Sequence, residues 1–238
     1  KKHRRNLTKN YELIYKKEII LIKVRKNNQS RGYKLSLDRK DLSGLVSIPN
    51  HIKYEEGLNF AKENISWISN QIIELKPIIY INDGTKIRLL NSTIKIKYIK
   101  SSTNKVRIIN NILEVHTKKK HSNILLEWIK NEVRKSSHKI INDFSKILNV
   151  KVSKIKISNS FSYWGSCNSK KEISINWRLI FCPSYVLQYI IAHELSHLLE
   201  FNHSKNFWKL VDTLISNRKV AQKWLKENDN YMYRLRFN

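Results

Sequence analysis

The first half of the chain alternates apolar and polar residues with a period of two. This pattern predicts strands over 19–24, 33–37, 45–48, 87–90, 93–99, 106–109 and 112–116. Asn82–Thr85 and Asn110–Asn111 carry residues typical of the turns between strands. One segment differs, because apolar residues at spacings of three and four predict a helix over about 55–75 that Pro77 ends. A β-rich amino-terminal part with one helix is therefore expected.

Near Thr117 the spacing of apolar residues changes from a period of two, typical of strands, to one of 3.6, typical of helices. An apolar stripe from Leu125 to Leu148 predicts a long helix, which Ser122 can cap. Strands over 154–158 and 172–176 follow, then helices that begin at Pro183 and at Ser204. The chain shows no internal repeat. We therefore predict an α+β protein with a β-rich domain over 1–118 and a second domain over 119–238.

The second domain contains His193-Glu194-Leu195-Ser196-His197 on a predicted helix. Four residues of helix place the two imidazoles about 40° apart and one turn along the axis, so both can bind one metal ion. Zinc in such a site lowers the pKa of water towards about 7, and Glu194 beside it can take the proton as general base. The structural alternative is two histidines on a half-buried helix with an exposed glutamate.

A catalytic zinc site needs a third protein ligand, and His203 is the best candidate. On an unbroken helix His203 would lie roughly 80° around the axis from His193 and beyond reach, so the helix must end between His197 and His203. Asn202 is expected in the left-handed conformation at this turn, and Ser204 can cap the next helix. Glu200 and Asp212 are the rival third ligands. His116, His121 and His138 lie in a charged region and are expected at the surface.

These residues, with their neighbours, resemble the YgjP-like zinc metallopeptidase family. The resemblance rests on the blocks 164–167 (Trp-Gly-Ser-Cys), 176–180, 193–197 and 202–208, with a fainter likeness at 46–49 and 83–84. It implies His193, His197 and His203 as zinc ligands and Glu194 as the catalytic residue. It also implies a β-rich part before a zincin-like domain. Tyr163 stands where the family typically has arginine, and Cys182 where a small residue such as alanine is usual.

Residues around the motif suggest further roles. Trp164, Trp177 and Trp208 could line a cleft, but tryptophans in such positions usually fill a core. Gly165 is expected in a turn that needs a positive φ. Cys167 is expected as a small buried apolar residue, with a redox-sensitive lid over the metal as the alternative.

Two more features concern substrate binding. Arg178 is expected either to stabilise an oxyanion or bind an anionic substrate, or to form a structural ion pair. The strand over 172–176 is a candidate edge strand for holding an extended peptide. Met232, the only methionine, lies in a charged tail too far from His203 for a methionine turn.

Composition adds a strong positive charge. The formal net charge is +27, which suits nucleic acid, an anionic surface or acidic substrates. Lysine supplies most of it, and the abundance of isoleucine and asparagine favours the coding bias of an AT-rich genome as its cause. Two cysteines cannot form a disulfide framework, and no apolar run suits a membrane span or a signal peptide. A cytoplasmic protein with no membrane association is expected, although its amino end, Lys1–Arg5, is basic.

The sequence thus predicts a zinc-dependent hydrolase, with a metallopeptidase as the first choice. Its substrate would be a peptide or protein. A nucleoside-triphosphate pyrophosphatase that uses the same site is the alternative, since members of the resembling family are credited with that activity. A nucleic-acid-associated protein with protease activity or structural zinc is the hypothesis of another class.

Overall fold

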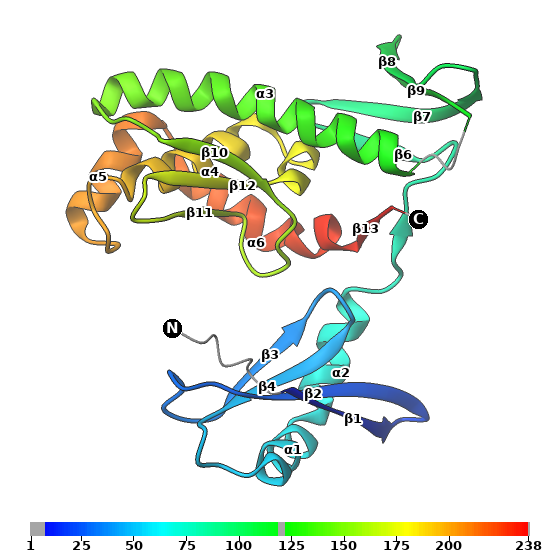
Figure 1. The fold of residues 1–238 in the computed structure, drawn as a ribbon, viewed down its shortest axis with the longest axis vertical. Helices are drawn as coiled ribbons and strands as arrows, with labels where there is room; N and C mark the ends of the chain where they lie inside the picture. Colours follow the sequence, from blue (N-terminus) through cyan, green and yellow to red (C-terminus); the bar gives the residue numbers. More distant parts are fainter. Residues whose placement is uncertain (1–7, 119–121, 238) are drawn as a thin grey trace. The chain divides into compact units, whose positions relative to one another are not determined.

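The computed structural model describes residues 8–118 and 122–237. The chain forms two compact units, Lys1–Ile78 and Ile79–Asn238, and each has its own hydrophobic core (Figure 1). Helices and sheets occur in both units, which confirms the α+β class.

The first unit is a four-stranded sheet with two helices. The sheet has the order β1-β2-β4-β3, with β1 (Thr8–Tyr15), β2 (Glu18–Lys26), β3 (Lys34–Asp38) and β4 (Ser43–Ile48). Strand β1 was not expected. The single helix predicted over about 55–75 is two helices, α1 (Tyr54–Glu63) and α2 (Ile65–Glu74). The break falls at Asn64, whose side-chain amide donates to the carbonyl of Phe60 at 2.8 Å in competition with the helix ladder.

The second unit opens with a sheet of the same topology. Its order is β6-β7-β9-β8, with β6 (Lys86–Leu89), β7 (Ser92–Lys100), β8 (Lys105–Ile109) and β9 (Ile112–Thr117). In both sheets the two central strands run parallel and each outer strand is antiparallel to its neighbour. The two sheets therefore repeat one topology, although no repeat was recognised in the sequence. The predicted turn at Asn110–Asn111 joins β8 to β9, and both residues have a positive φ.

Helix α3 (Ser122–Leu148) packs against α4 (Ser184–Ser196) and β10 in the second unit, and Figure 1 shows it lying along the sheet that contains β10. This sheet has the order β10-β12-β11, with β10 (Lys154–Ser158), β11 (Gly165–Cys167) and β12 (Glu172–Asn176). Strand β12 is central, so the expectation that 172–176 is an edge strand is wrong. The edge strands are β10 and β11, and β11 is too short to give an alternating signal.

The carboxyl end completes the core of the second unit. The 3₁₀ helix η1 (Trp177–Phe181) and the helices α4 (Ser184–Ser196), α5 (Lys205–Leu214) and α6 (Arg218–Arg234) follow β12. Strand β13 (Leu235–Arg236) then pairs in parallel with β5 (Ile79–Tyr80). The charged tail expected around Met232 is instead α6, with Met232 fully buried on its inner face.

The two units divide the chain earlier than the predicted boundary after residue 118. Apolar residues of β6, β7 and β9 share one core with α3 and α4, so these strands belong with the second unit. The change from period two to period 3.6 marks a change of secondary structure within that unit. Residues 119–121, where the predicted boundary and His121 fall, and Lys1–Arg5 lie outside the described residues.

Candidate metal centre

Helix α4 places the first two histidines inside the second unit. Most of its residues are buried, as expected for a helix that is apolar on nearly all sides. At its start the side chain of Asn91, in the turn between β6 and β7, accepts a hydrogen bond at 3.1 Å from the backbone N–H of Ser184. His193 and Glu194 lie in its last turn, and His197 is its C-cap residue.

Three imidazoles meet at this end of α4. The Nε2 atom of His193 lies 3.3 Å from that of His197 and 3.1 Å from that of His203. His193, His197 and His203 each offer a ligand atom to one point, and these atoms lie within 4.8 Å of one another. Within the described part of the chain, no other group of histidine, cysteine, aspartate or glutamate side chains is gathered in this way.

The donor set suits zinc. Zn–N bonds of about 2.0–2.1 Å in tetrahedral geometry separate neighbouring nitrogens by about 3.3–3.4 Å. The spacings of 3.3 and 3.1 Å around His193 lie close to that value. Neutral imidazole is also the form that binds a metal, and burial, together with the charges of His197 and His203, lowers the pKa of His193 to about 4. Three neutral nitrogens would leave a fourth position open.

The histidine rings are held in different ways. The Nδ1 atom of His197 lies 3.1 Å from the carbonyl oxygen of Glu200, a contact that leaves Nε2 free to accept a metal when Nδ1 carries the proton. The Nδ1 atom of His193 is buried and has no hydrogen-bond partner among the described residues. Aromatic packing holds that ring instead, with Phe207 at 4.9 Å and Trp208 at 5.9 Å between ring centroids.

Glu194 lies next to the cluster and is 6% exposed. Burial raises the pKa of this carboxyl to about 7. A Cβ atom at Gly165 would lie 2.7 Å from both Cγ and Oε1 of Glu194, closer than side chains tolerate. The φ of Gly165 is not positive, so the expected turn is wrong. Glycine stands here because the backbone of β11 passes directly beside the Glu194 side chain.

The chain turns between His197 and His203, where the helix was expected to end. The regular helix ends at Ser196, and the amide of Glu200 still donates to the carbonyl of Ser196 at 2.9 Å. Asn202 does not have a positive φ, so its predicted left-handed role is wrong. The hydroxyl of Ser204 accepts from the amide of Phe207 at 3.2 Å, which confirms Ser204 as the cap of α5.

The rival third ligands lie outside the cluster. Asp212 accepts a hydrogen bond from Arg218 at 2.6 Å, which occupies its carboxylate. Glu200 contributes its backbone carbonyl to His197. Arg218 was missed by the sequence reasoning, since nothing in the pattern pairs it with Asp212.

Arg178 has a different environment from the one predicted. It is 2% exposed, and its guanidinium carbon lies 4.2 Å from the ring centroid of Phe161 and 4.3 Å from that of Trp177. Its NH1 group donates to Asn159 at 2.9 Å, and no carboxylate of the described residues forms an ion pair with it. Burial and the charge of Arg236 lower its pKa to about 10. Asn159 was not singled out from the sequence.

The other residues around the motif also differ from one another. Trp177 is in the core, as expected, whereas Trp164 and Trp208 are only partly buried.

The two cysteines differ in burial. Cys167 is half-buried, and burial and the charge of Glu194 raise its pKa. Cys182 is fully buried and its thiol contacts the carbonyl of Leu179 at 2.8 Å. Tyr163 is exposed, and its carbonyl accepts from Asn176.

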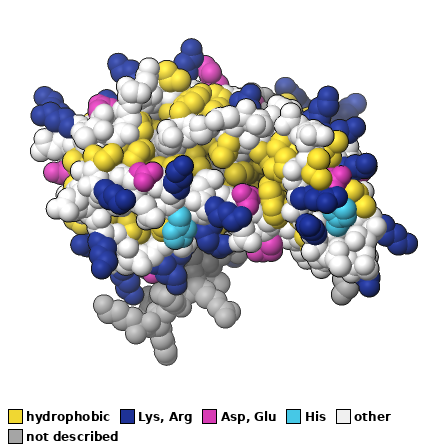
Figure 2. All heavy atoms as spheres, turned by 90° about the horizontal axis from the view of Figure 1, so that it is seen from above, with side chains coloured by type: hydrophobic (Ala, Val, Ile, Leu, Met, Phe, Trp, Pro, Cys, Tyr) yellow, Lys and Arg dark blue, Asp and Glu magenta, His cyan; other side chains and the backbone are white. Residues whose placement is uncertain are grey.

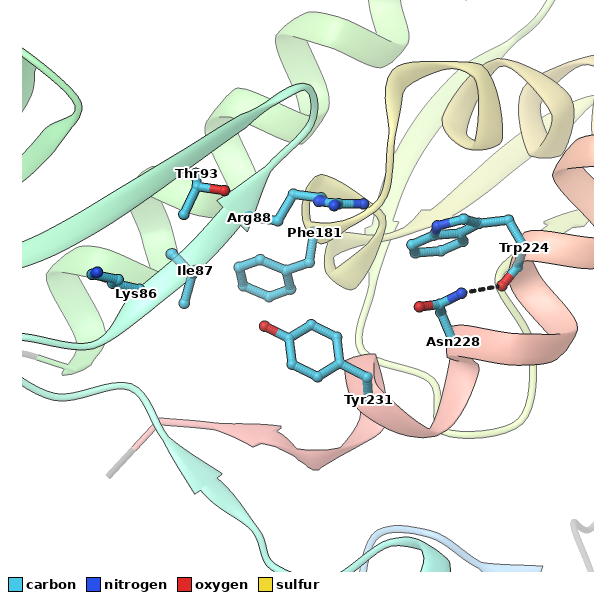
Figure 3. A pocket seen from close by; sticks show the side chains of 8 residues that line it. All are labelled: Lys86, Ile87, Arg88, Thr93, Phe181, Trp224, Asn228 and Tyr231. Carbon is cyan, nitrogen blue, oxygen red and sulfur yellow. Dashed lines mark hydrogen bonds between the residues drawn. The ribbon is translucent and has the colours of Figure 1, made fainter.

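A separate pocket of about 320 Å³ lies between β6 and α6 (Figure 3). It shares no residue with the histidine cluster, and its lining has basic, aromatic and amide side chains but no carboxylate. The lining residues are Lys86, Ile87, Arg88, Thr93, Phe181, Trp224, Asn228 and Tyr231.

Comparison with known proteins identifies the family. The profile described as "YgjP-like, metallopeptidase domain" matches residues 32–228, which include the whole histidine cluster. No curated protein matches significantly.

Two crystal structures of metallopeptidase zymogens match a smaller part of the chain. Abylysin of Pyrococcus abyssi is 18% identical with a TM-score of 0.34, and the match covers 38% of this chain and 90% of that one. Jannalysin of Methanocaldococcus jannaschii is 26% identical with a TM-score of 0.34, and the match covers 40% of this chain and 96% of that one. The profile match spans more than half of the 238 residues, and the chain therefore belongs to the YgjP-like metallopeptidase family, as its motifs predicted.

Proposed function

We propose that the chain is a zinc-dependent peptidase in which His193, His197 and His203 hold the metal and Glu194 is the general base. The observation that carries this proposal is the convergence of three Nε2 atoms at the end of α4, with a buried carboxylate on the adjacent residue. Membership of a metallopeptidase family supports the reaction class.

The chemistry follows from the positions of these groups. Zinc at the cluster would lower the pKa of water and polarise a substrate carbonyl. Glu194 would accept the proton of the attacking water through its carboxylate and deliver it to the leaving amine. Its low exposure keeps bulk water away from this carboxylate. In the metal-free protein, burial raises the pKa of this carboxyl to about 7.

The substrate would lie along β11. This strand pairs with β12 on one side, and no second partner strand is found for it among the described residues. An extended peptide can hydrogen-bond to such an edge by main-chain pairing. Because Gly165 of β11 lies against Glu194, a peptide held there would pass close to the general base.

Substitution of Glu194 tests the catalytic part of the proposal. Glu194→Gln keeps the shape of the side chain but removes its basicity, so peptide hydrolysis should fall by about 10²-fold or more. Zinc content, measured by atomic emission, should stay the same. Full turnover by zinc-loaded Glu194→Gln protein would contradict the role of this carboxylate.

Substitution of His203 tests the ligand set. His203→Ala should lose stoichiometric zinc after dialysis, whereas Asp212→Asn should retain the ion because Asp212 lies outside the cluster. Retention of zinc by Asp212→Asn would show that removal of a nearby negative charge is not enough to release the ion. Unchanged zinc in His203→Ala would point to another third ligand.

A nucleic-acid partner is the second candidate, favoured by the pocket between β6 and α6. Figure 3 shows Arg88 beside Phe181, with Trp224 and Tyr231 across the pocket. Phe181 is fully buried, whereas the partly exposed rings of Trp224 and Tyr231 can stack on a base, and Lys86 and Arg88 can contact phosphate. Lys86 and Arg88 form no ion pair with any described carboxylate.

On the face that Figure 2 shows, Lys and Arg side chains are spread out and not gathered in one patch. Nucleic-acid binding through the pocket predicts affinity for single-stranded oligonucleotide that falls steeply with salt and is reduced in Arg88→Glu. Absence of oligonucleotide binding at low salt would remove this candidate. Absence of nucleotide hydrolysis in the comparison of the parent with Glu194→Gln would separately remove a pyrophosphatase at the histidine cluster.

A further inference from the structure

We propose that Trp208 and Arg218 are positioning residues that orient His203 for metal binding. The inference rests on the proposed zinc site and deepens it, because it identifies what fixes the ligand that lies outside α4. It concerns the affinity of the site for its metal and is independent of which substrate is cleaved.

Among the described residues, the ring of His203 lacks the hydrogen bond to its own chain segment that holds the ring of His197. His203 is exposed, whereas the other two histidines are half-buried, and it lies in the turn between α4 and α5. The ring of His197 is fixed by the carbonyl of Glu200, but no backbone or carboxylate partner of the His203 ring is found in the described part of the chain. Its orientation must therefore come from packing.

The packing partner is Trp208. Its ring stacks on that of His203, with centroids 5.7 Å apart and planes 25° apart. Phe207 meets the same imidazole edge-on, at 4.7 Å and 81°. A stacked indole restricts the tilt of the imidazole, and an edge contact restricts its rotation, so the Nε2 atom is kept towards His193.

Arg218 in turn fixes Trp208. Its guanidinium carbon lies 4.6 Å from the centre of the Trp208 ring, a cation–π distance, and NH1 donates to the Trp208 carbonyl at 3.3 Å. NH1 also donates to Asp212, one turn further along α5, at 2.6 Å. Because Arg218 is the first residue of α6, these contacts tie the start of that helix to the ring behind His203.

The ion pair between Arg218 and Asp212 is expected to contribute little to the stability of the fold. The Asp212 side chain is 52% exposed, and ion pairs at such a surface contribute little to stability. The guanidinium of Arg218 contacts the ring and the backbone carbonyl of Trp208 and the carboxylate of Asp212, and these contacts together restrict the orientation of the Trp208 indole. Residues that orient a metal ligand in this way commonly change metal affinity by about 10- to 100-fold when they are removed.

Chelator competition on the full chain tests the inference, with the zinc dissociation constant as the readout. Trp208→Ala should weaken zinc binding by about 10- to 100-fold and Arg218→Ala by about tenfold. Trp208→Phe, which keeps a stacking ring, should recover most of the affinity. Arg218→Lys keeps the charge but not the planar guanidinium against the indole, so its zinc affinity should stay below that of the parent. Trp67→Ala, at an exposed position in the first unit, is the matched control and should bind zinc as the parent does.

The melting temperature of each metal-free variant separates positioning from folding. It should be nearly unchanged in Arg218→Ala and Trp208→Phe, and these two variants carry the test if Trp208→Ala fails to fold. Zinc binding within about twofold of the parent in Arg218→Ala and Trp208→Ala, while His203→Ala binds poorly, would overturn the inference and leave the zinc site standing. Equal affinity of the parent and His203→Ala would show that His203 is not a ligand and would remove the inference. No zinc binding by either protein would overturn the zinc site and the inference with it.

Discussion

The side chain of Glu194 fills the space that a Cβ atom at Gly165 would need. Such an atom would lie 2.7 Å from Cγ and Oε1 of that carboxylate. Because Glu194 is near the end of a buried helix and Gly165 is on an edge strand, neither residue alone reveals the contact. Glycine is therefore required at this position to leave room for the Glu194 side chain, and not because its own backbone needs a positive φ.

Gly165→Ala should consequently impair hydrolysis more than stability. The new methyl group forces the Glu194 side chain to move, and a displacement of about 1 Å at a reacting group can cost about 10²-fold in rate. Unfolding free energy should change by less than about 1 kcal/mol, because a rotatable side chain can move and alanine restricts the unfolded chain. Urea unfolding and kcat/KM on one peptide check both parts.

Gly32→Ala is the matched control for this prediction. A Cβ atom at Gly32 would meet nothing within 4 Å, and the position has no positive φ. It should leave activity and stability unchanged. Full activity in Gly165→Ala would show that Glu194 does not need its present place.

At the scale of elements, the turn between α4 and α5 decides whether three histidines can meet. The regular part of α4 ends at Ser196, and Ser204 begins a new helix by accepting a hydrogen bond from Phe207. This cap starts α5 directly after His203 and presents Phe207 and Trp208 to the cluster. A local rule of helix capping thus controls a long-range geometry.

Ser204→Ala should destabilise the second unit by about 1 kcal/mol, the usual effect of losing such a cap. Ser204→Asp supplies another side-chain acceptor and should restore stability. Urea unfolding of the metal-free protein measures the effect without a contribution from zinc. Equal stability in all three proteins would mean that the hydrogen bond to Phe207 does not support α5.

At the scale of the whole molecule, the two cores belong to different stretches of chain. The core of the first unit runs from Ile20 to Ile72, and the core of the second from Ile81 to Leu235. The histidine cluster and every residue proposed to support it lie in the second unit. In the described part of the chain, no helix is long and apolar enough to cross a bilayer.

A fragment of residues 79–238 should therefore fold alone and bind one zinc ion per chain. A fragment of residues 119–238, cut at the boundary that the sequence predicted, should not fold cooperatively. It lacks Ile87, Ile94, Leu113 and Val115, which pack in the same core as α3 and α4. Circular dichroism during thermal unfolding and zinc content distinguish the two fragments. Cooperative, zinc-binding 119–238 would show that β6 to β9 are dispensable.

The sequence determined the parts of this protein that depend on local spacing. Alternation fixed most strands, the stripe from Leu125 to Leu148 fixed α3, and the capping residue fixed the start of α5. The zinc hypothesis also came from spacing, since residues four apart on a helix share a face. The family followed from the order of short motifs, and the profile match confirms it.

Only the tertiary structure decided which distant segments meet. It placed β12 in the centre of its sheet and β11 at the edge, put β6 to β9 with the second core, and explained Gly165 by the side chain of Glu194. It also placed Arg218 against Trp208 behind His203. These relations depend on contacts between residues far apart or in different elements. Periodicity reports the face on which a residue lies, and packing decides what that face touches.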